Sequence, residues 1–303
     1  MRPQNVLGPL LALASAAQSA QIVLTNDDGW AVAQIRAQKD ALTTAGYNVI
    51  LSAPAQDQSG SGSSSTTPFP PTKNLPSPCE YNSCPTGSPA EGFNASDPSL
   101  NYVNGYPVDS AKYGIQYLAP KLFNNTKPDL VVSGPNVGSN TGAVTLLSGT
   151  VGAACEAALE GIPALSISGV STSEVSYTTL LSDPTSQATL AAGIYASLTV
   201  KLVQALLANT TTPILPPGIV LNVNYPATDS CAAPSDYKFV LSRIYWNPFH
   251  TDVETCGSTT LPTESSVEGT AGCYVSVSVY QASNKLDANA TMQGVVLEKL
   301  GAC

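Results

Sequence analysis

The sequence predicts an α/β fold built around a mostly parallel sheet, and three neighbouring stretches carry that prediction. Ile22–Thr25 is a short, mostly apolar run typical of a buried strand, and Asn48–Ala53 is a second such run, ended by Pro54. Between them, residues 30–45 place apolar side chains at helical spacing, and Gly46 ends the run. A strand, a helix and a strand within about thirty residues form a βαβ unit, whose two strands lie parallel.

The rest of the chain continues this alternation. We expect helices at Pro107–Leu118, from Ser148 to about Glu160 and at Ala188–Ala208, and strands at Pro128–Ser133, Pro163–Ser168 and Ile219–Val223. Ile219–Val223 is expected to be the last core strand. The remainder is expected to be β-rich and looped, with β patterns at Tyr237–Trp246 and Tyr274–Tyr280.

Residues 68–104 interrupt the alternation. They are rich in Pro, Asn and Ser, and they hold too few apolar side chains to build a core of their own. We therefore expect a single domain over residues 21–303 that carries an irregular, disulfide-pinned insertion at 68–104.

The first residues predict export. Arg2 precedes an apolar run at Val6–Ala17 that ends in small residues, which is the pattern of a signal peptide over residues 1–17 with cleavage between 16 and 20. We find no later stretch apolar enough to cross a bilayer, so a secreted, extracellular protein with no membrane partner is expected. Four sequons agree with export and predict N-glycosylation, at Asn94, Asn124, Asn209 and Asn289.

Seven cysteines in an exported chain predict disulfides with one thiol left over. Cys79 and Cys84 are expected to close a small loop. Cys155 lies in an Ala-rich helical run and is expected to be the free, buried thiol. The remaining cysteines allow three pairings: Cys231, Cys256, Cys273 and Cys303.

Charge and histidine content argue against several classes of protein. A net charge of −9 with no basic run argues against a nucleic-acid polymer as partner. His250 is the only histidine, which is too few for a histidine-nucleophile phosphatase or a His-rich binuclear hydrolase. A Ser-His-Asp esterase would need His250 itself, and the chain has no Gly-x-Ser-x-Gly turn. His250 is therefore expected in a surface loop, and Gly60–Gly62 lacks the third glycine of a dinucleotide-binding loop.

Oxygen-bearing side chains follow three of the expected strands. Asp27 and Asp28 come after the first strand, Ser59 lies on the loop after the second, and Asn136 follows the strand at 128–133. Because parallel strands present their carboxyl ends at one edge of the sheet, these side chains can converge there once Gly29 turns the chain. An all-oxygen site suits one divalent cation, Mg²⁺ or Mn²⁺ and also Ca²⁺. The alternative for Asp27 and Asp28 is a helix N-cap with a spare acid beside it.

Ser148, Gly149 and Thr150 begin the next expected helix. The N-terminus of a helix offers unpaired N–H groups and a positive dipole end, so it can bind an anion. A hard cation beside such an anion site is the arrangement expected of an enzyme that hydrolyses phosphate esters. Asp27 or Asp28 would then accept a proton from an attacking water, while Ser148–Thr150 and Asn136 stabilise the phosphoryl oxygens.

Six motifs occur in order along the chain: Thr25–Gly29, Gln58–Gly60, Gly105–Asp109, Ser133–Gly138, Leu147–Val151 and Leu221–Pro226. In these motifs the chain resembles the SurE survival-protein family of phosphatases and nucleotidases, and Gly272–Val279 resembles the late β segment of that family. The resemblance implies a three-layer Rossmann-like (SurE-like) fold with a β-rich C-terminal extension used in a homodimer or homotetramer. It also implies divalent-metal-dependent hydrolysis of phosphomonoesters, often nucleoside monophosphates.

Carried over position by position, the resemblance assigns residues to roles. The metal positions fall on Asp27, Asp28, Ser59 and Asn136, and the phosphate positions on Gly60, Ser148, Gly149 and Thr150. The chain departs from the family at Val32–Gln34, at Gln58 and in the insertion, which has no counterpart.

Further polar and aromatic residues are candidates for a supporting shell or a substrate wall: Asn26, Asp109, Asn222, Arg243 and Trp246. Helix stabilisation is the alternative for Asp109, loop tethering for Asn222, and ordinary packing for Arg243 and Trp246. The alternative to an enzyme is a secreted protein that keeps the fold and binds metal or phosphate without turnover.

Overall fold

The structure is a computed structural model that describes residues 19–170, 173–208, 213–229 and 231–301. Its strands are β1 Gln21–Thr25, β2 Asn48–Pro54, β3 Glu91–Asn94, β4 Asp97–Val103, β5 Leu130–Val137, β6 Ala164–Gly169, β7 Ile219–Tyr225, β8 Lys238–Ser242 and β9 Tyr274–Gln281. Its α-helices are α1 Ala33–Thr44, α2 Pro107–Tyr113, α3 Ala119–Leu122, α4 Gly149–Leu159, α5 Thr179–Ser182, α6 Gln187–Leu207, α7 Glu264–Glu268 and α8 Ala290–Leu300.

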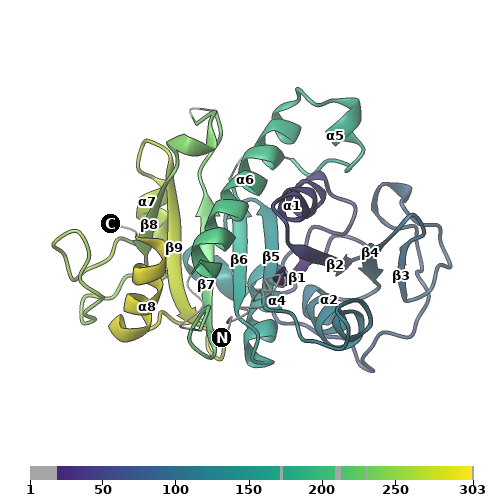
Figure 1. The fold of residues 1–303 in the computed structure, drawn as a ribbon, viewed down its shortest axis with the longest axis horizontal. Coiled ribbons are helices and arrows are strands. Elements are labelled where there is room, and N and C mark those ends of the chain that lie inside the picture. The colour runs from purple at the N-terminus through teal and green to yellow at the C-terminus, as the bar shows by residue number, and fades with distance from the viewer. Residues whose placement is uncertain (1–18, 171–172, 209–212, 230, 302–303) are drawn as a thin grey trace, which may run out of the picture.

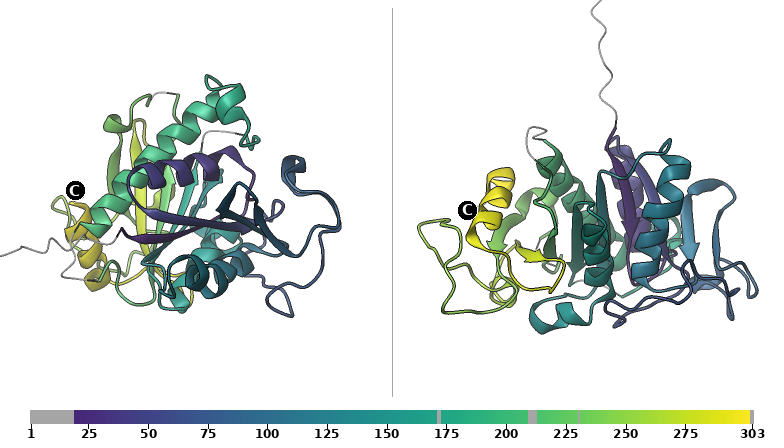
Figure 2. Two further views of the ribbon diagram at one scale, coloured as in Figure 1. Left: turned by 45° about the vertical axis from the view of Figure 1, so that its right-hand side comes forward. Right: turned by 90° about the horizontal axis from the view of Figure 1, so that it is seen from below.

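These strands form one sheet in the order β3-β4-β2-β1-β5-β6-β7-β9-β8. The six central strands, from β4 to β7, are parallel to their neighbours, whereas β3 and β9 run antiparallel to β4 and β7. The predicted α/β fold with a mostly parallel sheet is thus confirmed. The carboxyl ends of β2, β1 and β5 lie side by side at one edge, which Figures 1 and 2 show from three directions.

Helices cover both faces of the sheet, which gives three layers (Figures 1 and 2). Leu24 of β1 belongs to the core that includes α1 and α6, whereas its neighbour Val23 belongs to the core that includes α4. Successive side chains of a strand point to opposite faces, so a strand buried on both faces is apolar at every position. This is the reason why Ile22–Leu24 of β1 is a continuous apolar run.

Helix α6 corrects one expectation. By length and composition alone, its 21 residues could cross a membrane, although no such stretch was expected after the signal region. Half of its most apolar window is buried. Leu198 and Leu202 of α6 lie in the same buried core as Ile35 and Leu42 of α1, so the apolar face of α6 serves the protein core.

The insertion is less irregular than expected. Its last part forms the hairpin β3–β4, and β4 pairs with β2 in parallel, with Leu51 opposite Leu100. Leu100 and Tyr102 are buried in the main core, so the insertion adds strands to the existing sheet and needs no core of its own. Its polar residues, such as Ser99 and Asn101, alternate with these apolar ones and obscure the strand in the sequence.

The C-terminal part also differs from expectation. The strand β7 is not the last core strand, because β9 lies between β7 and β8 and is buried along nearly its whole length. Its serines are buried, and Ser278 hydrogen-bonds Ser242 at 2.9 Å inside the sheet. The terminal helix α8 was not predicted at all.

The cysteine predictions are confirmed where the structure describes them. Cys79 is bonded to Cys84, and Cys155 is free and buried. Of the three open pairings, the structure has Cys231 bonded to Cys273. Cys256 is also disulfide-bonded, and Cys303 lies outside the described residues.

The predicted signal segment, residues 1–17, and Asn209 lie outside the described residues as well. Of the other sequon asparagines, Asn124 and Asn289 are exposed and Asn94 is half-buried in the β3–β4 turn. Asn289 begins α8 by accepting a hydrogen bond from the Met292 amide at 3.1 Å. Glycosylation of these sites stays a prediction.

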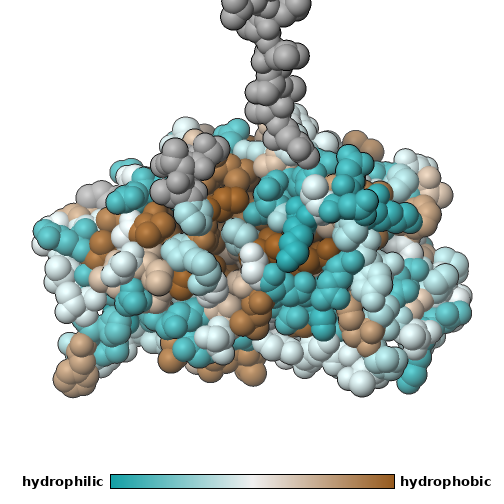
Figure 3. All heavy atoms as spheres, turned by 60° about the horizontal axis from the view of Figure 1, so that its bottom comes forward, coloured by the Kyte–Doolittle hydropathy of each residue, from teal (hydrophilic) through white to brown (hydrophobic). Residues whose placement is uncertain are grey.

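On the face shown in Figure 3, hydrophilic residues separate the apolar groups.

Candidate active site

The chain turns sharply where β1 ends. The Asn26 side chain donates to the Gly29 carbonyl at 3.1 Å and accepts from the Gly29 amide at 3.2 Å. Gly29 has a φ of 112°, which L side chains rarely adopt. We call residues 26–29 the carboxylate turn. It holds Asp27 and Asp28 at the carboxyl edge of the sheet, and both are buried.

Asp28 is only half satisfied. Its Oδ2 accepts a hydrogen bond from the Val137 amide at 3.0 Å, whereas its Oδ1 is buried with no hydrogen-bond partner among the described residues. A register shift in β5 between Ser133 and Asn136 produces this contact. Gly134 is required there, because a Cβ atom would lie 2.1 Å from the Ile167 carbonyl oxygen.

Asp27 is in contact with the start of α4. Its carboxylate accepts a hydrogen bond from the Thr150 hydroxyl. A Cβ atom on Gly149 would lie 2.9 Å from the Asp27 Cβ atom and 2.8 Å from the Ser61 hydroxyl oxygen. Glycine therefore allows the N-terminus of α4 to touch the carboxylate turn, and Ser148 caps the helix by accepting from the Val151 amide at 3.1 Å.

The loop after β2 is the third segment that contacts the carboxylate turn, in addition to β5 and α4. The Gln58 amide donates to the Asp27 carbonyl at 2.8 Å, and the Gly62 amide donates to the Leu147 carbonyl at 2.9 Å. The loop that carries Ser59 and Gly60, both exposed, therefore spans the gap between Asp27 and α4. Ser61, which the sequence did not single out, has a buried hydroxyl with no hydrogen-bond partner in the described chain.

Asn136 completes the group. It lies in β5 opposite Ser168 of β6, half-buried, and its amide donates to the Gly138 carbonyl at 2.6 Å. The segments that carry the residues proposed for metal or phosphate thus meet at this edge of the sheet: Asp27, Asp28, Ser59, Gly60, Asn136, Ser148, Gly149 and Thr150. They are the turn after β1, the loop after β2, the end of β5 and the start of α4.

Two adjacent, buried carboxyl groups dominate the electrostatics of the site. Burial raises the pKa of Asp27, and hydrogen bonds from the Thr150 hydroxyl and amide offset part of that rise. Burial also raises the pKa of Asp28 well above its ordinary value, and the Asp27 charge raises it further. Within the described ranges, the ion pairs include neither carboxylate. Two adjacent carboxylates in this state favour a bound cation.

The supporting residues fall into two groups. Asn26 closes the carboxylate turn. The buried carboxylate of Asp109 accepts hydrogen bonds from the Tyr106 amide at 2.9 Å and from the Thr66 amide at 3.0 Å. Asp109 therefore ties the loop after Ser61 to the start of α2. Arg243 and Trp246 lie beyond β8, which is five strands from β1, or roughly 24 Å at the usual strand spacing.

A row of buried polar side chains crosses the sheet at the level of Thr25. The strand registers align it: Thr25, Ser133, Ser166, Asn222, Ser278 and Ser242. We call these six residues the polar row. Asn222 donates to the Asn140 carbonyl at 2.8 Å and to the buried carboxyl of Glu264 at 2.7 Å, so it tethers the loop after Asn136. One polar residue per strand gives no signal until the strands are aligned.

Comparison with known proteins agrees with this geometry. The family model described as "Survival protein SurE" matches residues 22–245. An acid phosphatase from Yarrowia lipolytica is 36% identical over 301 residues, covering 89% of this chain and 82% of the relative. A 5'-nucleotidase SurE from Nitratidesulfovibrio vulgaris is 36% identical over 229 residues, covering 76% of this chain and 70% of the relative.

A solved structure shows the same fold. The SurE protein from Aquifex aeolicus superposes with a TM-score of 0.60 at 22% identity, covering 92% of this chain and 98% of that one. The motifs, the family match and the curated relatives all point the same way. The chain is a member of the SurE survival-protein family.

Proposed function

We propose that this protein is a divalent-metal-dependent phosphomonoester hydrolase that acts on nucleoside monophosphates or other small phosphate esters. The observation that carries the proposal is the buried, unpartnered Oδ1 of Asp28 beside Asp27, within contact of a helix N-terminus. The names of the relatives, acid phosphatase and 5'-nucleotidase, support the same reaction class.

The residues fit a hard cation. Asp27, Asp28, Ser59 and Asn136 offer only oxygen donors, which suits Mg²⁺ or Mn²⁺, and Ca²⁺ as a third candidate. Among the described residues, one oxygen of Asp28 has no donor and is available to a metal ion. When bound, the cation would polarise a phosphoryl oxygen and make a water molecule more acidic.

The surrounding groups have their own tasks. The exposed backbone at Gly60 and the first residues of α4, from Ser148 to Thr150, offer hydrogen-bond donors to the phosphate. The Thr150 hydroxyl holds Asp27 in place. Asp27 or Asp28 would take a proton from the attacking water. Hydrolysis of phosphate monoesters needs on the order of 20 kcal/mol of barrier reduction, so donors and cation must act together.

The test is phosphate release by the purified, full-length protein. We expect turnover of p-nitrophenyl phosphate and adenosine 5'-monophosphate with Mg²⁺ or Mn²⁺, and loss of turnover after EDTA that returns when the metal is restored. Absence of metal-dependent release from a broad panel of esters would instead favour the alternative, a protein that binds metal or phosphate without turnover.

Two further expectations belong to this proposal. Secretion is supported by the Cys79–Cys84 and Cys231–Cys273 disulfides, because disulfides persist mainly in oxidising compartments. A homodimer or homotetramer is proposed from the family resemblance, and light scattering of the purified protein would measure it.

A further inference from the structure

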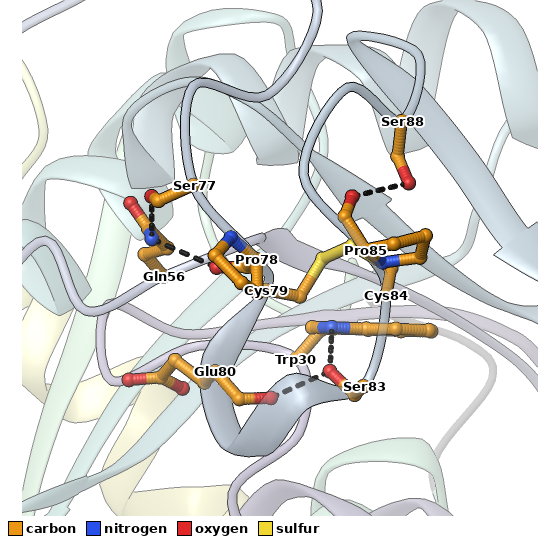
Figure 4. The surroundings of a disulfide bond; sticks show 10 residues. All are labelled: Trp30, Gln56, Ser77, Pro78, Cys79, Glu80, Ser83, Cys84, Pro85 and Ser88. Atoms are coloured by element: carbon orange, nitrogen blue, oxygen red, sulfur yellow. Dashed lines mark hydrogen bonds between the residues drawn. A yellow bond between two sulfur atoms is a disulfide. The ribbon is translucent and has the colours of Figure 1, made fainter.

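The disulfide-closed loop of the insertion lies against Trp30 (Figure 4). Within the loop, the Cys79 amide donates to the Cys84 carbonyl at 3.0 Å, in addition to the disulfide between these residues. Trp30, which directly follows the carboxylate turn, donates from its indole to the Ser83 hydroxyl at 3.0 Å. The loop is therefore fixed both internally and to the residue next to Gly29.

Glu80 fixes the other side of this loop. Its amide donates to the Ala55 carbonyl at 3.0 Å, and its Oε1 accepts from the Asp57 amide at 3.1 Å. Its Oε2 is so close to Gly29 that a Cβ atom there would lie only 2.0 Å away. The loop is thus held between the turn after β1 and the loop after β2, both of which carry candidate metal-binding residues.

Tyr81 is the residue that this anchoring presents. It has left-handed backbone angles, φ 52° and ψ 29°, and it remains 42% exposed. Burial and then the charges of Glu80, Glu174, Asp28 and Asp57 raise the pKa of its hydroxyl to about 12. Tyr81 directly follows Glu80, whose carboxyl group lies against Gly29 and accepts from the Asp57 amide, so the chain places the partly exposed Tyr81 beside the carboxylate turn.

We propose that Tyr81 forms a wall of the active site against which a planar leaving group, a nucleobase or an aryl ring, packs during hydrolysis. The proposal rests on the phosphomonoesterase function proposed above. A rigid aromatic face beside a phosphate site provides stacking contact that is independent of the chemical step. Tyr81 is thus a specificity residue: it selects among esters by their alcohol portion and leaves the phosphate chemistry to the carboxylate turn.

The experiment compares two kinds of ester in the full-length protein. We measure kcat/KM for adenosine 5'-monophosphate and for glycerol 2-phosphate with wild type, Tyr81→Phe and Tyr81→Ala. Tyr81→Ala should lower kcat/KM for the nucleotide about tenfold, a typical stacking contribution, and leave glycerol 2-phosphate within about twofold. Tyr81→Phe keeps the ring and should behave like wild type. Phe93→Ala, which removes another exposed aromatic ring of the insertion, is the matched control and should change neither substrate.

The outcomes separate this inference from the function on which it rests. An equal fall in kcat/KM for both esters in Tyr81→Ala would mean that Tyr81 only supports the fold. An unchanged kcat/KM for the nucleotide would mean that the ring does not contact the leaving group. Either result overturns the inference, while the hydrolase function itself stands. If wild type hydrolyses no ester, the proposed function fails. Calorimetry with adenosine 5'-monophosphate and inorganic phosphate then decides: tighter nucleotide binding that Tyr81→Ala abolishes supports the wall, and equal binding overturns it.

Discussion

Two pairs of carboxylates, one after β1 and the other after β8 and β9, differ in how their charge is satisfied. Asp252 and Asp287 share Arg243, with N–O distances of 2.9 Å and 3.5 Å. Asp252 also accepts from the Leu261 amide and the Gln293 side chain, at 3.0 Å and 2.9 Å. Asp287 accepts from the amides of Ile244 and Tyr245.

Asp27 and Asp28 are at least as deeply buried as Asp252 and Asp287, but they have fewer partners among the described residues. The described chain gives them no cation, and one oxygen of Asp28 has no donor. The polar row repeats the contrast: Ser242 and Ser278 bond each other, whereas the hydroxyls of Thr25 and Ser133 have no partner within the described residues. A buried polar group without a partner costs free energy, so the unsatisfied carboxyl oxygen beside Asp27 supports the proposal of a cation site there.

The largest effect should come from neutralising the unsatisfied pair. Asp28→Asn keeps the size of the side chain and removes its charge, so kcat/KM should fall about a thousandfold or more. The thermal midpoint should stay near that of wild type or rise, because a repulsive buried charge is removed. Phosphate release and thermal unfolding measure the two effects, and a variant that keeps full activity would contradict the metal assignment.

Removing the cation shared by Asp252 and Asp287 should have the opposite effect: a large loss of stability with little change in activity. Arg243→Met leaves Asp252 and Asp287 buried without their cation, which should cost about 3–5 kcal/mol of the free energy of unfolding. Activity per folded molecule should change little, because Arg243 lies far from the carboxylate turn. Urea unfolding measures the loss, and an undiminished free energy of unfolding would show that the ion pair is structurally dispensable.

Glu264 is intermediate between the two pairs in how its carboxyl group is satisfied, because one oxygen has a hydrogen-bond partner and the other has none among the described residues. It is fully buried and bonded to Asn222, and burial raises its pKa from 4.5 to about 8. Between these values the folded protein keeps a proton that the unfolded chain has lost, so this group lowers stability as pH rises, by up to about 1.4 kcal/mol per pH unit, and no further above pH 8.

Glu264→Gln removes this titration and keeps an oxygen for Asn222. The variant should therefore gain stability relative to wild type between pH 5 and pH 8, as measured by urea unfolding at four pH values. Comparison with wild type cancels the contributions of other groups that titrate in both proteins. A difference that does not change with pH would show that Glu264 is already ionised in the folded state.

The sequence predicts the carboxylate turn well because its geometry follows from topology. Once the strands are parallel, Asp27 and Asn136 must end at the same edge, and Gly149 must begin a helix there. The contacts of Ser61 and Glu80 depend on loop paths that no periodicity encodes. Likewise, β4 and β9 carry polar residues that find partners only inside the assembled sheet, so their burial is invisible in a single strand pattern.

The smallest effect should come from Trp246, which the sequence placed among the wall candidates. Its side chain is 76% exposed beside the satisfied ion pair, so Trp246→Ala should change the free energy of unfolding by less than about 0.5 kcal/mol. It should also leave kcat/KM for adenosine 5'-monophosphate unchanged, unlike Tyr81→Ala. A tenfold fall in activity with unchanged stability would break the comparison, because a residue so far from Asp27 in its own chain could act only through the site of a second copy.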